Sequence, residues 1–362
     1  MRNADIEVLV TGGTGFVGRW LLAALTARGR RVAAVVRRAA ARSEELADFV
    51  AAIGGDPQRL MLVEGDVQAP SLGLEGAFAG VRDVFHVAGR YAFGMEAGEA
   101  RRANVEGSLH AAEWALARPT LRRFVFVGGY RMTRPVPGLS RDAYPLREAE
   151  QSRLYRRHGA YEASKHESYL ALQHFAKGRA LLWTSVHPSS VIGDSRTGQT
   201  TQVLGLGDMV ERLWRRKLPA LVGTPRTFVP LVTVDYLASF LASVPERAET
   251  LGQELCVLDT ATPPLPDLIR AVATHLGVSA PRLLLCAGLV RALPKALTGV
   301  EPETLSFLSE DRYDTAAAEA HATATGLEHP PLLTSVTRWC DYLVSTGFGT
   351  AASQQSIAMY QT

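Results

Sequence analysis

The stretch Leu9-Val10-Thr11-Gly12-Gly13-Thr14-Gly15-Phe16-Val17-Gly18 decides the fold of this 362-residue chain. It places Gly12, Gly15 and Gly18 between a short apolar run and a helix-like pattern. At this spacing the first glycine permits a tight turn, the second lets the backbone approach a pyrophosphate, and the third lets the helix pack closely on the strand. Free N–H groups at the helix N-terminus would then bind phosphate oxygens. The candidate cofactor-binding residues of this loop are Gly12, Thr14, Gly15, Phe16, Val17 and Gly18.

Short apolar runs alternate with helix-length patterns through the first two-thirds of the chain, as in a series of βαβ units. The expected strands are rich in Val, Leu and Phe, which is typical of strands covered by helices on both faces. They are Glu7–Thr11, Arg31–Val36, Arg59–Glu64, Asp83–His86, Arg123–Val127, Leu181–Ser185 and Glu254–Leu258. Helical spacing of apolar residues is found at Val17–Arg28, Glu99–Ala117, Ala160–Phe175, Leu265–Leu276 and Arg282–Leu297.

These patterns predict an α/β fold: a Rossmann-type, doubly wound parallel sheet with a smaller, interleaved C-terminal substrate-capping region. We expect the nucleotide-binding core in residues 1–190, completed by about 227–260. The cap is expected in 191–226 and 261–350, and a mobile tail in 351–362.

Composition excludes several classes of protein. The formal net charge is +3 and charges are evenly scattered, which argues against a nucleic-acid partner. Three distant cysteines, Cys256, Cys286 and Cys340, have no metal-ligand spacing and fit a reduced intracellular protein. No apolar stretch reaches the roughly 20 residues of a membrane span, and strand-like sequence begins too early for a signal peptide. We therefore expect a cytoplasmic protein with no metal and no membrane span.

The end of the second strand is expected to hold the cofactor ribose, about 20 residues after the loop. NAD enzymes carry Asp or Glu there, whereas this chain reads Val35-Val36-Arg37-Arg38. A guanidinium binds a 2′-phosphate with paired charge-assisted hydrogen bonds, so Arg37 favours NADP(H). The alternative is that Arg37 and Arg38 are solvated charges in an arginine-rich chain.

A candidate proton donor follows in Tyr161-Glu162-Ala163-Ser164-Lys165, which places a phenol and an ammonium at i and i+4 on one helix face. The pKa of a phenol is near 10, so it must fall by about 3 for proton transfer at neutral pH. A nearby ammonium supplies part of this decrease. With ten tyrosines and four lysines in the chain, chance produces roughly 0.1 such pairs. The pair predicts Tyr161 and Lys165 as catalytic residues; the alternative is two ordinary helix residues.

Together these motifs resemble the extended short-chain dehydrogenase/reductase family, over about residues 6–340. The resemblance rests on Thr11–Gly18, Gly65-Asp66-Val67, Val84–Gly89, Asn104–Gly107, Tyr161–Lys165 and Val234-Asp235-Tyr236. Within that family, His187–Gly198 is most similar to the branch of thioester reductases and fatty acyl reductases, in which an Arg normally stands at the position of His187.

The resemblance implies roles for further residues. Asp66 and Val67 would flank the adenine, Ala88 and Gly89 would line the cofactor channel, and Pro188 would lie near the nicotinamide amide. Tyr161 would be the general acid, with Lys165 on the nicotinamide ribose. Asn104 would support the catalytic helix or take part in a proton path. The alternative is an ordinary helix residue that makes a structural hydrogen bond. Asp235 looks like a structural acid at a helix start.

One departure from the family pattern follows the strand Phe124–Val127. The family carries a Ser or Thr there, whose hydroxyl steadies the developing oxyanion, whereas this chain has Gly128-Gly129-Tyr130. Loss of such a donor typically costs about 3–4 kcal/mol of transition-state stabilisation. Tyr130, Thr133, Ser189 or a bound water could replace it.

The sequence therefore favours an NADPH-dependent oxidoreductase that reduces an aldehyde, ketone or acyl thioester. The substrate is expected to be a small molecule or an acyl chain, carried by coenzyme A or a separate carrier, and a homodimer is possible. Two alternatives stay open: a sugar-nucleotide epimerase or dehydratase, and a degenerate family member that binds NADP(H) without redox turnover.

Overall fold

The computed structural model describes residues 2–74, 78–90, 95–140, 142, 144–203, 205–286, 288, 290 and 307–349. The chain divides into two compact units, each described by itself below. The first consists of Met1–Pro188, Leu237–Val257 and Tyr313–Leu327, and the second of Ser189–Tyr236, Leu258–Arg312 and Glu328–Thr362. Of the segment 227–260 expected to complete the core, Leu237–Val257 belongs to the first unit, and so does Tyr313–Leu327, which lies in the range expected for the cap.

The first unit is built on a seven-stranded sheet in which every neighbouring pair is parallel, in the order β10-β6-β5-β4-β1-β2-β3. The strands are β1 (Val8–Thr11), β2 (Val32–Val36), β3 (Leu60–Glu64), β4 (Asp83–His86), β5 (Arg123–Val127), β6 (Trp183–Pro188) and β10 (Glu254–Val257). The chain winds outward from β1 in one direction and from β4 in the other. The carboxyl ends of β1 and β4 therefore mark the switch point, where ligands bind in sheets of this kind. The expected Rossmann fold and its seven strands are confirmed.

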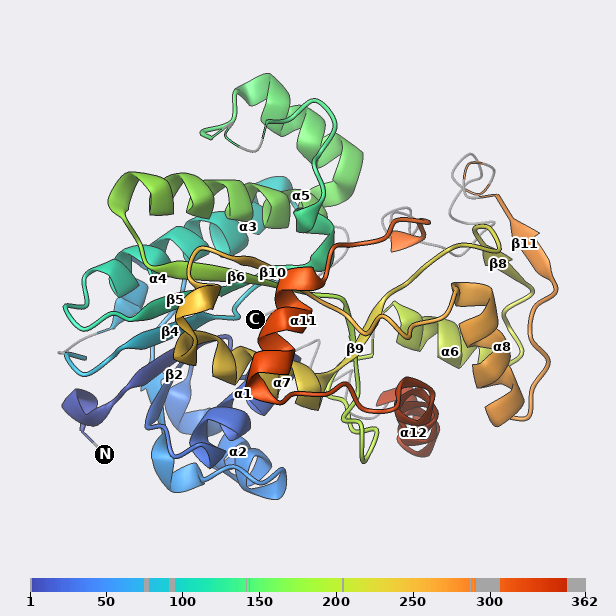
Figure 1. Cartoon of the computed structure of the whole chain (residues 1–362), viewed down its shortest axis with the longest axis horizontal. Coiled ribbons are helices and arrows are strands. Elements are labelled where there is room, and N and C mark those ends of the chain that lie inside the picture. The colour runs from blue at the N-terminus through green and yellow to red at the C-terminus, as the bar shows by residue number, and fades with distance from the viewer. Residues whose placement is uncertain are drawn as a thin grey trace. The chain divides into compact units, whose positions relative to one another are not determined.

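Helices cover both faces of this sheet (Figure 1): α3, α4 and α5 lie on one side, and α1 and α2 on the other. Their bounds are α1 (Phe16–Ala27), α2 (Ala39–Ala52), α3 (Ala97–Ala100), α4 (Gly107–Leu116) and α5 (Glu148–Arg179). Phe124 and Phe126 of β5 pack with Trp114 of α4 and Leu172 of α5 in the apolar core. The expected helix at Glu99–Ala117 is confirmed with one interruption, because a π-helical turn, η4 (Arg101–Glu106), separates α3 from α4.

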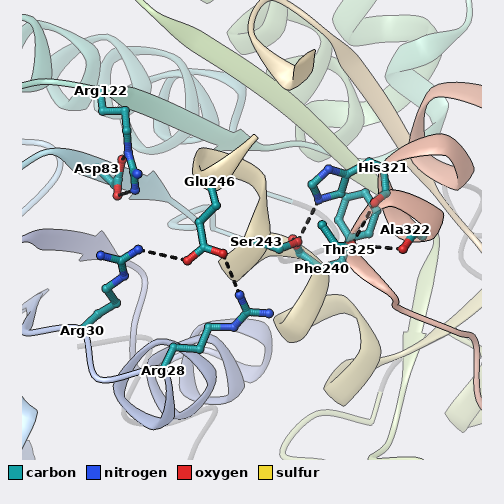
Figure 2. Close-up of polar contacts among 10 residues, drawn as sticks. All are labelled: Arg28, Arg30, Asp83, Arg122, Phe240, Ser243, Glu246, His321, Ala322 and Thr325. Carbon is teal, nitrogen blue, oxygen red and sulfur yellow. Dashed lines mark hydrogen bonds and ion pairs between the residues drawn. The ribbon is translucent and has the colours of Figure 1, made fainter. Parts of the chain in front are cut away.

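Two late segments complete the first unit. They contribute part of α7 (Val234–Ser243), β10 and α11 (Ala316–Thr325). Figure 2 shows how they are tied to the rest: Glu246 accepts hydrogen bonds from Arg28 and Arg30, both at 3.0 Å. The buried side chains of Ser243 and His321 are hydrogen-bonded, with 2.8 Å between Oγ and Nε2. The short 3-10 turns of this unit are η1 (Asn3–Asp5), η2 (Pro57–Arg59), η3 (Pro70–Gly73), η5 (Tyr130–Thr133), η6 (Val244–Glu246) and η7 (Ala248–Thr250).

The second unit has a separate apolar core, in which Trp339 and Leu343 of α12 pack with Leu268 and Val272 of α8. Its elements are β7 (Ser190–Ile192), α6 (Leu206–Trp214), β8 (Ala220–Val222), β9 (Leu231–Thr233), α8 (Leu265–His275), β11 (Leu283–Leu285), α12 (Leu332–Ser345) and η9 (Gly347–Gly349). β7 pairs with β9 and β8 with β11, both in parallel.

One expected helix was wrong at its start. We expected a helix over Arg282–Leu297, but Leu283–Leu285 forms β11, a strand paired with β8. A short continuous apolar run does not distinguish helix from strand by its period, and pairing with β8 decided the outcome. Residues 291–297 of that expected helix and the expected tail at 351–362 lie outside the described residues. Within the described part of the chain, no helix combines the length and apolar character needed to cross a bilayer.

Candidate functional site

The glycine loop between β1 and α1 is constrained by backbone contacts. Gly12 has φ +77°, and a Cβ at this position would lie 2.5 Å from the backbone N of Ala88. A Cβ on Gly18 would lie only 2.0 Å from the carbonyl oxygen of Gly12. By contrast, a Cβ on Gly15 would meet only that same oxygen, at 3.3 Å. Gly12 thus makes the turn, Gly18 allows the helix to close on it, and Gly15 leaves space beside the loop.

The N-terminus of α1 is suited to an anion. The cap residue, Gly15, is extended (φ −74°, ψ 171°), and no side chain caps the helix. The first N–H groups of α1, at Phe16, Val17 and Gly18, therefore remain available to phosphate oxygens. The loop is held from the other side, because Arg19 Nε donates to the carbonyl oxygen of Thr14 at 2.9 Å. The glycine loop and the N-terminus of α1 can therefore accommodate the pyrophosphate of a dinucleotide.

The end of β2 carries a carboxylate contact that the sequence analysis missed. Arg37 is exposed directly after the strand, and Arg38 has φ +56°. Glu64, the last residue of β3, accepts hydrogen bonds from the backbone N–H groups of Arg38 and Ala39 at 2.8 and 2.7 Å. These bonds lower the pKa of Glu64 and fix the start of α2. The contact of Arg37 with a 2′-phosphate stays a prediction.

Asp66 and Val67, expected beside the adenine, form a turn after β3. The N–H of Asp66 donates to Leu72 O at 2.9 Å, and Asp66 Oδ1 accepts from the N–H of Gln68 at 2.9 Å. Val67 packs where a side chain at Gly107 would lie, because a Cβ there would be 3.2 Å from Val67 Cγ2. Both predicted residues are only partly buried, so a ligand can reach them.

The segment after β4 meets the catalytic helix. A Cβ on Gly89 would lie 2.9 Å from Lys165 Nζ, so the expected channel residue Gly89 borders the expected catalytic lysine. Lys165 is 9% exposed, and its Nζ lies 5.9 Å from the centre of the Phe126 ring. Burial lowers the pKa of Lys165 to about 8, while the charge of Glu162 acts in the opposite direction. The ammonium is therefore present below about pH 8 and lost above it.

Asn104 braces the same place. Its Oδ1 accepts from the backbone N–H of Arg90 at 2.7 Å, and its Nδ2 donates to Ser164 Oγ at 2.8 Å. Asn104 lies in the π-helical turn, a distortion that is frequent at functional sites. It joins the segment after β4 to the residue that precedes Lys165, and a role in a proton path stays a prediction.

The helix that carries Tyr161 is broken just before it. Gly159 of α5 has φ +77° and ψ 165°, so a second helical segment begins at this point and Tyr161, half-buried, lies in its first turn. Glu167, which is 1% exposed, connects the two segments. It accepts hydrogen bonds from Gln151 Nε2 at 2.9 Å and from Tyr155 OH at 2.8 Å, both on the preceding segment.

The two glycines after β5 differ in their surroundings. A Cβ on Gly128 would lie 2.6 Å from Nδ1 of the fully buried His187 and 2.9 Å from Met132 Sδ. A Cβ on Gly129 would meet only Met132 Cε, at 3.9 Å, and the backbone there is extended (φ −157°). His187 thus occupies the space that a side chain at position 128 would need, whereas position 129 can accept one.

The residues considered as substitutes for the missing hydroxyl have different surroundings. Tyr130 is 5% exposed, and its ring meets that of Tyr313 edge to face with centroids 4.9 Å apart. The Thr133 hydroxyl donates to the carbonyl oxygen of Tyr130 at 2.8 Å. Ser189 belongs to the second unit, whereas Pro188 ends β6 opposite Val257 of β10.

Two other polar groups are structural. Asp235, at the start of α7, accepts hydrogen bonds from the N–H and hydroxyl of Ser195 at 3.0 and 2.6 Å. His86 is fully buried between Thr11 Oγ1 at 2.8 Å and Ser108 Oγ at 3.0 Å, and burial lowers its pKa to about 3. No group of three or more His, Cys, Asp or Glu residues in the described part of the chain could hold a metal ion.

Comparison with known proteins decides the family, because the male sterility protein family model matches residues 10–241. The chain belongs to this family of extended short-chain dehydrogenases/reductases. It is 28% identical over 278 residues to a putative dihydroflavonol 4-reductase of Synechocystis, covering 75% of this chain and 73% of that protein. It is also 32% identical over 203 residues to a ketoreductase of Stigmatella aurantiaca that acts on 4-hydroxy-2-methyl-3-oxo-4-farnesyl-3,4-dihydroquinoline-1-oxide, covering 55% of this chain and 54% of that protein.

Among solved structures, the fold is similar to the terminal R domain from the myxalamid PKS-NRPS biosynthetic pathway. The TM-score is 0.75 at 20% identity, with 95% of this chain and 92% of the other covered. This likeness supports the Rossmann-like architecture expected from the sequence.

Proposed function

We propose that this chain is an NADP(H)-dependent oxidoreductase that reduces a carbonyl group, with Tyr161 as the proton donor. The main observation behind the proposal is the close approach of Gly89 to Lys165, because a Cβ added at position 89 would lie only 2.9 Å from Lys165 Nζ. It brings the carboxyl end of β4, beside the glycine loop, to the helix that bears the tyrosine. Relatives described as a dihydroflavonol reductase and a ketoreductase fit the same chemistry.

The cofactor preference rests on Arg37. Bound NADPH would supply the hydride, and the N–H groups at the start of α1 would hold its pyrophosphate. Arg37 is exposed at the end of β2, and its guanidinium can pair with a 2′-phosphate. The carboxylate of Glu64, at the end of the neighbouring strand β3, accepts hydrogen bonds from the N–H groups of Arg38 and Ala39.

Tyr161 and Lys165 have different roles in the proton transfer. Tyr161 gives its phenolic proton to the carbonyl oxygen as negative charge develops there. The Lys165 ammonium, one helical turn away, lowers the free energy of the resulting phenolate and would also bind the nicotinamide ribose. The acceptor is an aldehyde, a ketone or an acyl thioester. The last of these is suggested by the similarity to a PKS-NRPS R domain and would arrive on coenzyme A or a separate carrier.

The experiment is an NADPH-oxidation screen over medium-chain aldehydes, ketones and acyl-coenzyme A esters. The parent should turn over one of these classes, and Tyr161→Phe should lower the turnover number by at least about 10²-fold while NADPH affinity stays within a few-fold. Tyr342→Phe, on α12 of the second unit, is the matched control and should behave as the parent.

Unchanged turnover in Tyr161→Phe would overturn the assignment of the proton donor. NADPH binding without any carbonyl reduction by the parent would instead favour a nucleotide-binding protein without redox turnover, the function that Gly128-Gly129 suggests.

A further inference from the structure

A buried carboxylate beside the catalytic pair has no role in the reaction described above. Glu162, next to Tyr161 in the chain, is 7% exposed. Arg131 Nε donates to Glu162 Oε1 at 2.8 Å, and His166 Nε2 lies 3.6 Å from the same oxygen. Burial opposes ionisation of Glu162, but contacts with His166 and Arg131 outweigh it and lower the pKa of the carboxyl. Glu162 is therefore a buried anion at neutral pH.

Glu162 lies on the same side of α5 as Lys165, because residues three apart are neighbours on a helix. Desolvation disfavours the charged form of a buried lysine, and a nearby opposite charge offsets this effect. The charge of Lys165 also acts on His86 of β4, which is neutral at pH 7 because burial lowers its pKa to about 3. Tyr161, one helical turn before Lys165, lies on the same face of α5. Glu162 itself faces Arg131 of η5 and His158 and His166 of α5.

Arg131 gives Glu162 a second connection. It lies in η5, two residues after Gly129, and its side chain is 18% exposed. The Arg131–Glu162 pair therefore joins the segment after β5, where the family carries its hydroxyl, to the helix that carries Tyr161 and Lys165. The other deeply buried carboxylates in the described part of the first unit have different partners: Glu167 of α5 pairs with Arg101, and Asp83 of β4 pairs with Arg122.

We propose that Glu162 is a positioning residue: it is the counter-charge of the Lys165 ammonium, and through Arg131 it holds the segment after β5 against the catalytic helix. The kinetic part of this inference rests on the proposed function. The charge on Lys165 does not, because it can be measured without turnover.

The direct test is the titration of Lys165 by NMR. The chain has only four lysines, so a protein labelled with ¹³C at lysine Cε gives few signals, and Lys165→Met identifies the one from Lys165. In the parent its midpoint should lie at about 8. In Glu162→Gln the midpoint should fall, because the ammonium loses its counter-charge. Glu167→Gln removes an equally buried carboxylate from the same helix and should leave the midpoint in place.

An unchanged midpoint in Glu162→Gln would overturn the proposal. If this variant fails to fold because Arg131 has lost its bond to Glu162, the double variant Glu162→Gln/Arg131→Met removes both charges together. Its Lys165 midpoint should also lie below that of the parent, and a midpoint equal to or above it would contradict the proposal.

Kinetics supply the second readout. Glu162→Gln should lower kcat roughly tenfold near pH 7.5 with KM within about twofold, because it disturbs catalytic geometry and not substrate contacts. Glu162→Asp, which keeps the charge, should recover most of the loss. An equal loss in Glu162→Asp and Glu162→Gln would mean that shape and not charge matters, against the counter-charge role. If no carbonyl is reduced even by the parent, the proposed function fails, but the Lys165 titration still decides the present proposal.

Discussion

In the glycine loop, close contacts between backbone atoms limit which residues fit. In the segment after β5, contacts with side chains set that limit. Gly18 is required because a Cβ would lie 2.0 Å from the carbonyl oxygen of Gly12, in the same loop. At position 128 only glycine fits, because His187 of β6 occupies the space that a side chain would need. Arg131 pairs with Glu162 of α5. The contact between Gly18 and Gly12 follows from local geometry alone, whereas Gly12 also meets the backbone of Ala88 after β4. The segment after β5 depends on residues that only the tertiary fold brings together.

The largest effect is expected from adding a side chain to the glycine loop. Gly18→Ala should lower the free energy of unfolding by about 3 kcal/mol and weaken NADPH binding, because helix α1 must move away from Gly12. Gly178→Ala is the matched control, since a Cβ there meets nothing within 4 Å, and it should be neutral or slightly stabilising. Urea unfolding and nucleotide titration measure both. Equal stability of the two variants would show that the loop is not sterically constrained.

The next effect concerns the missing hydroxyl. Gly129→Ser should raise the turnover number by up to ~10²-fold with little change in KM, because a donor at this position acts on the transition state. The backbone is extended and the nearest atom to a Cβ is 3.9 Å away, so the serine fits. Tyr130→Phe in the parent is the companion measurement. A neutral Gly129→Ser together with a large loss in Tyr130→Phe would mean that the site uses Tyr130 as its donor.

A smaller effect separates the two neighbouring glycines. Gly128→Ser should lower the free energy of unfolding by about 1–3 kcal/mol, because the new side chain would overlap His187 and Met132. Gly129→Ser should stay close to the parent in thermal unfolding. If the two variants were equally stable, His187 would not be the reason for the glycine at position 128.

The smallest effect is expected at the end of β2. The parent should bind NADPH more tightly than NADH, and Arg37→Asp should reverse the order, with each change on the order of tenfold, or about 1.4 kcal/mol. Arg38→Asp is the control, because the backbone N–H of Arg38 is already held by Glu64. Equal titration curves for the two nucleotides in the parent would remove Arg37 from the site.

Most of the sheet could be predicted from the sequence because its strands are short apolar runs between glycine-, proline- and arginine-rich turns. All seven were located within three residues of their observed ends, with the largest shift at β6. The exception outside the sheet, β11, is an apolar run whose type depends on its partner β8. The sequence also indicated the roles of Gly12 and Gly18, because the spacing of the glycines in the loop is local.

The buried charges could not be predicted in the same way. Glu162 follows Tyr161 in the sequence, but nothing in the sequence indicates that Arg131 would reach it or that Glu162 would be buried. Glu64 looked like the end of a strand, yet its carboxylate fixes the start of α2 through two backbone N–H groups. Such pairs form between segments far apart in the chain, and no local pattern encodes them.

The central claim is that a carbonyl group is reduced at Tyr161, and transfer of deuterium tests it most directly. NADPH carrying deuterium at both C4 positions of the nicotinamide is incubated with the protein and the carbonyl panel, and the products are analysed by mass spectrometry. With the parent we expect one deuterium on the former carbonyl carbon for each hydride transferred, in the alcohol formed from an aldehyde or ketone or in the aldehyde formed when an acyl thioester releases its thiol. Tyr161→Phe should give at least about 10²-fold less of this product. Tight NADPH binding with no deuterium in any product would contradict the claim.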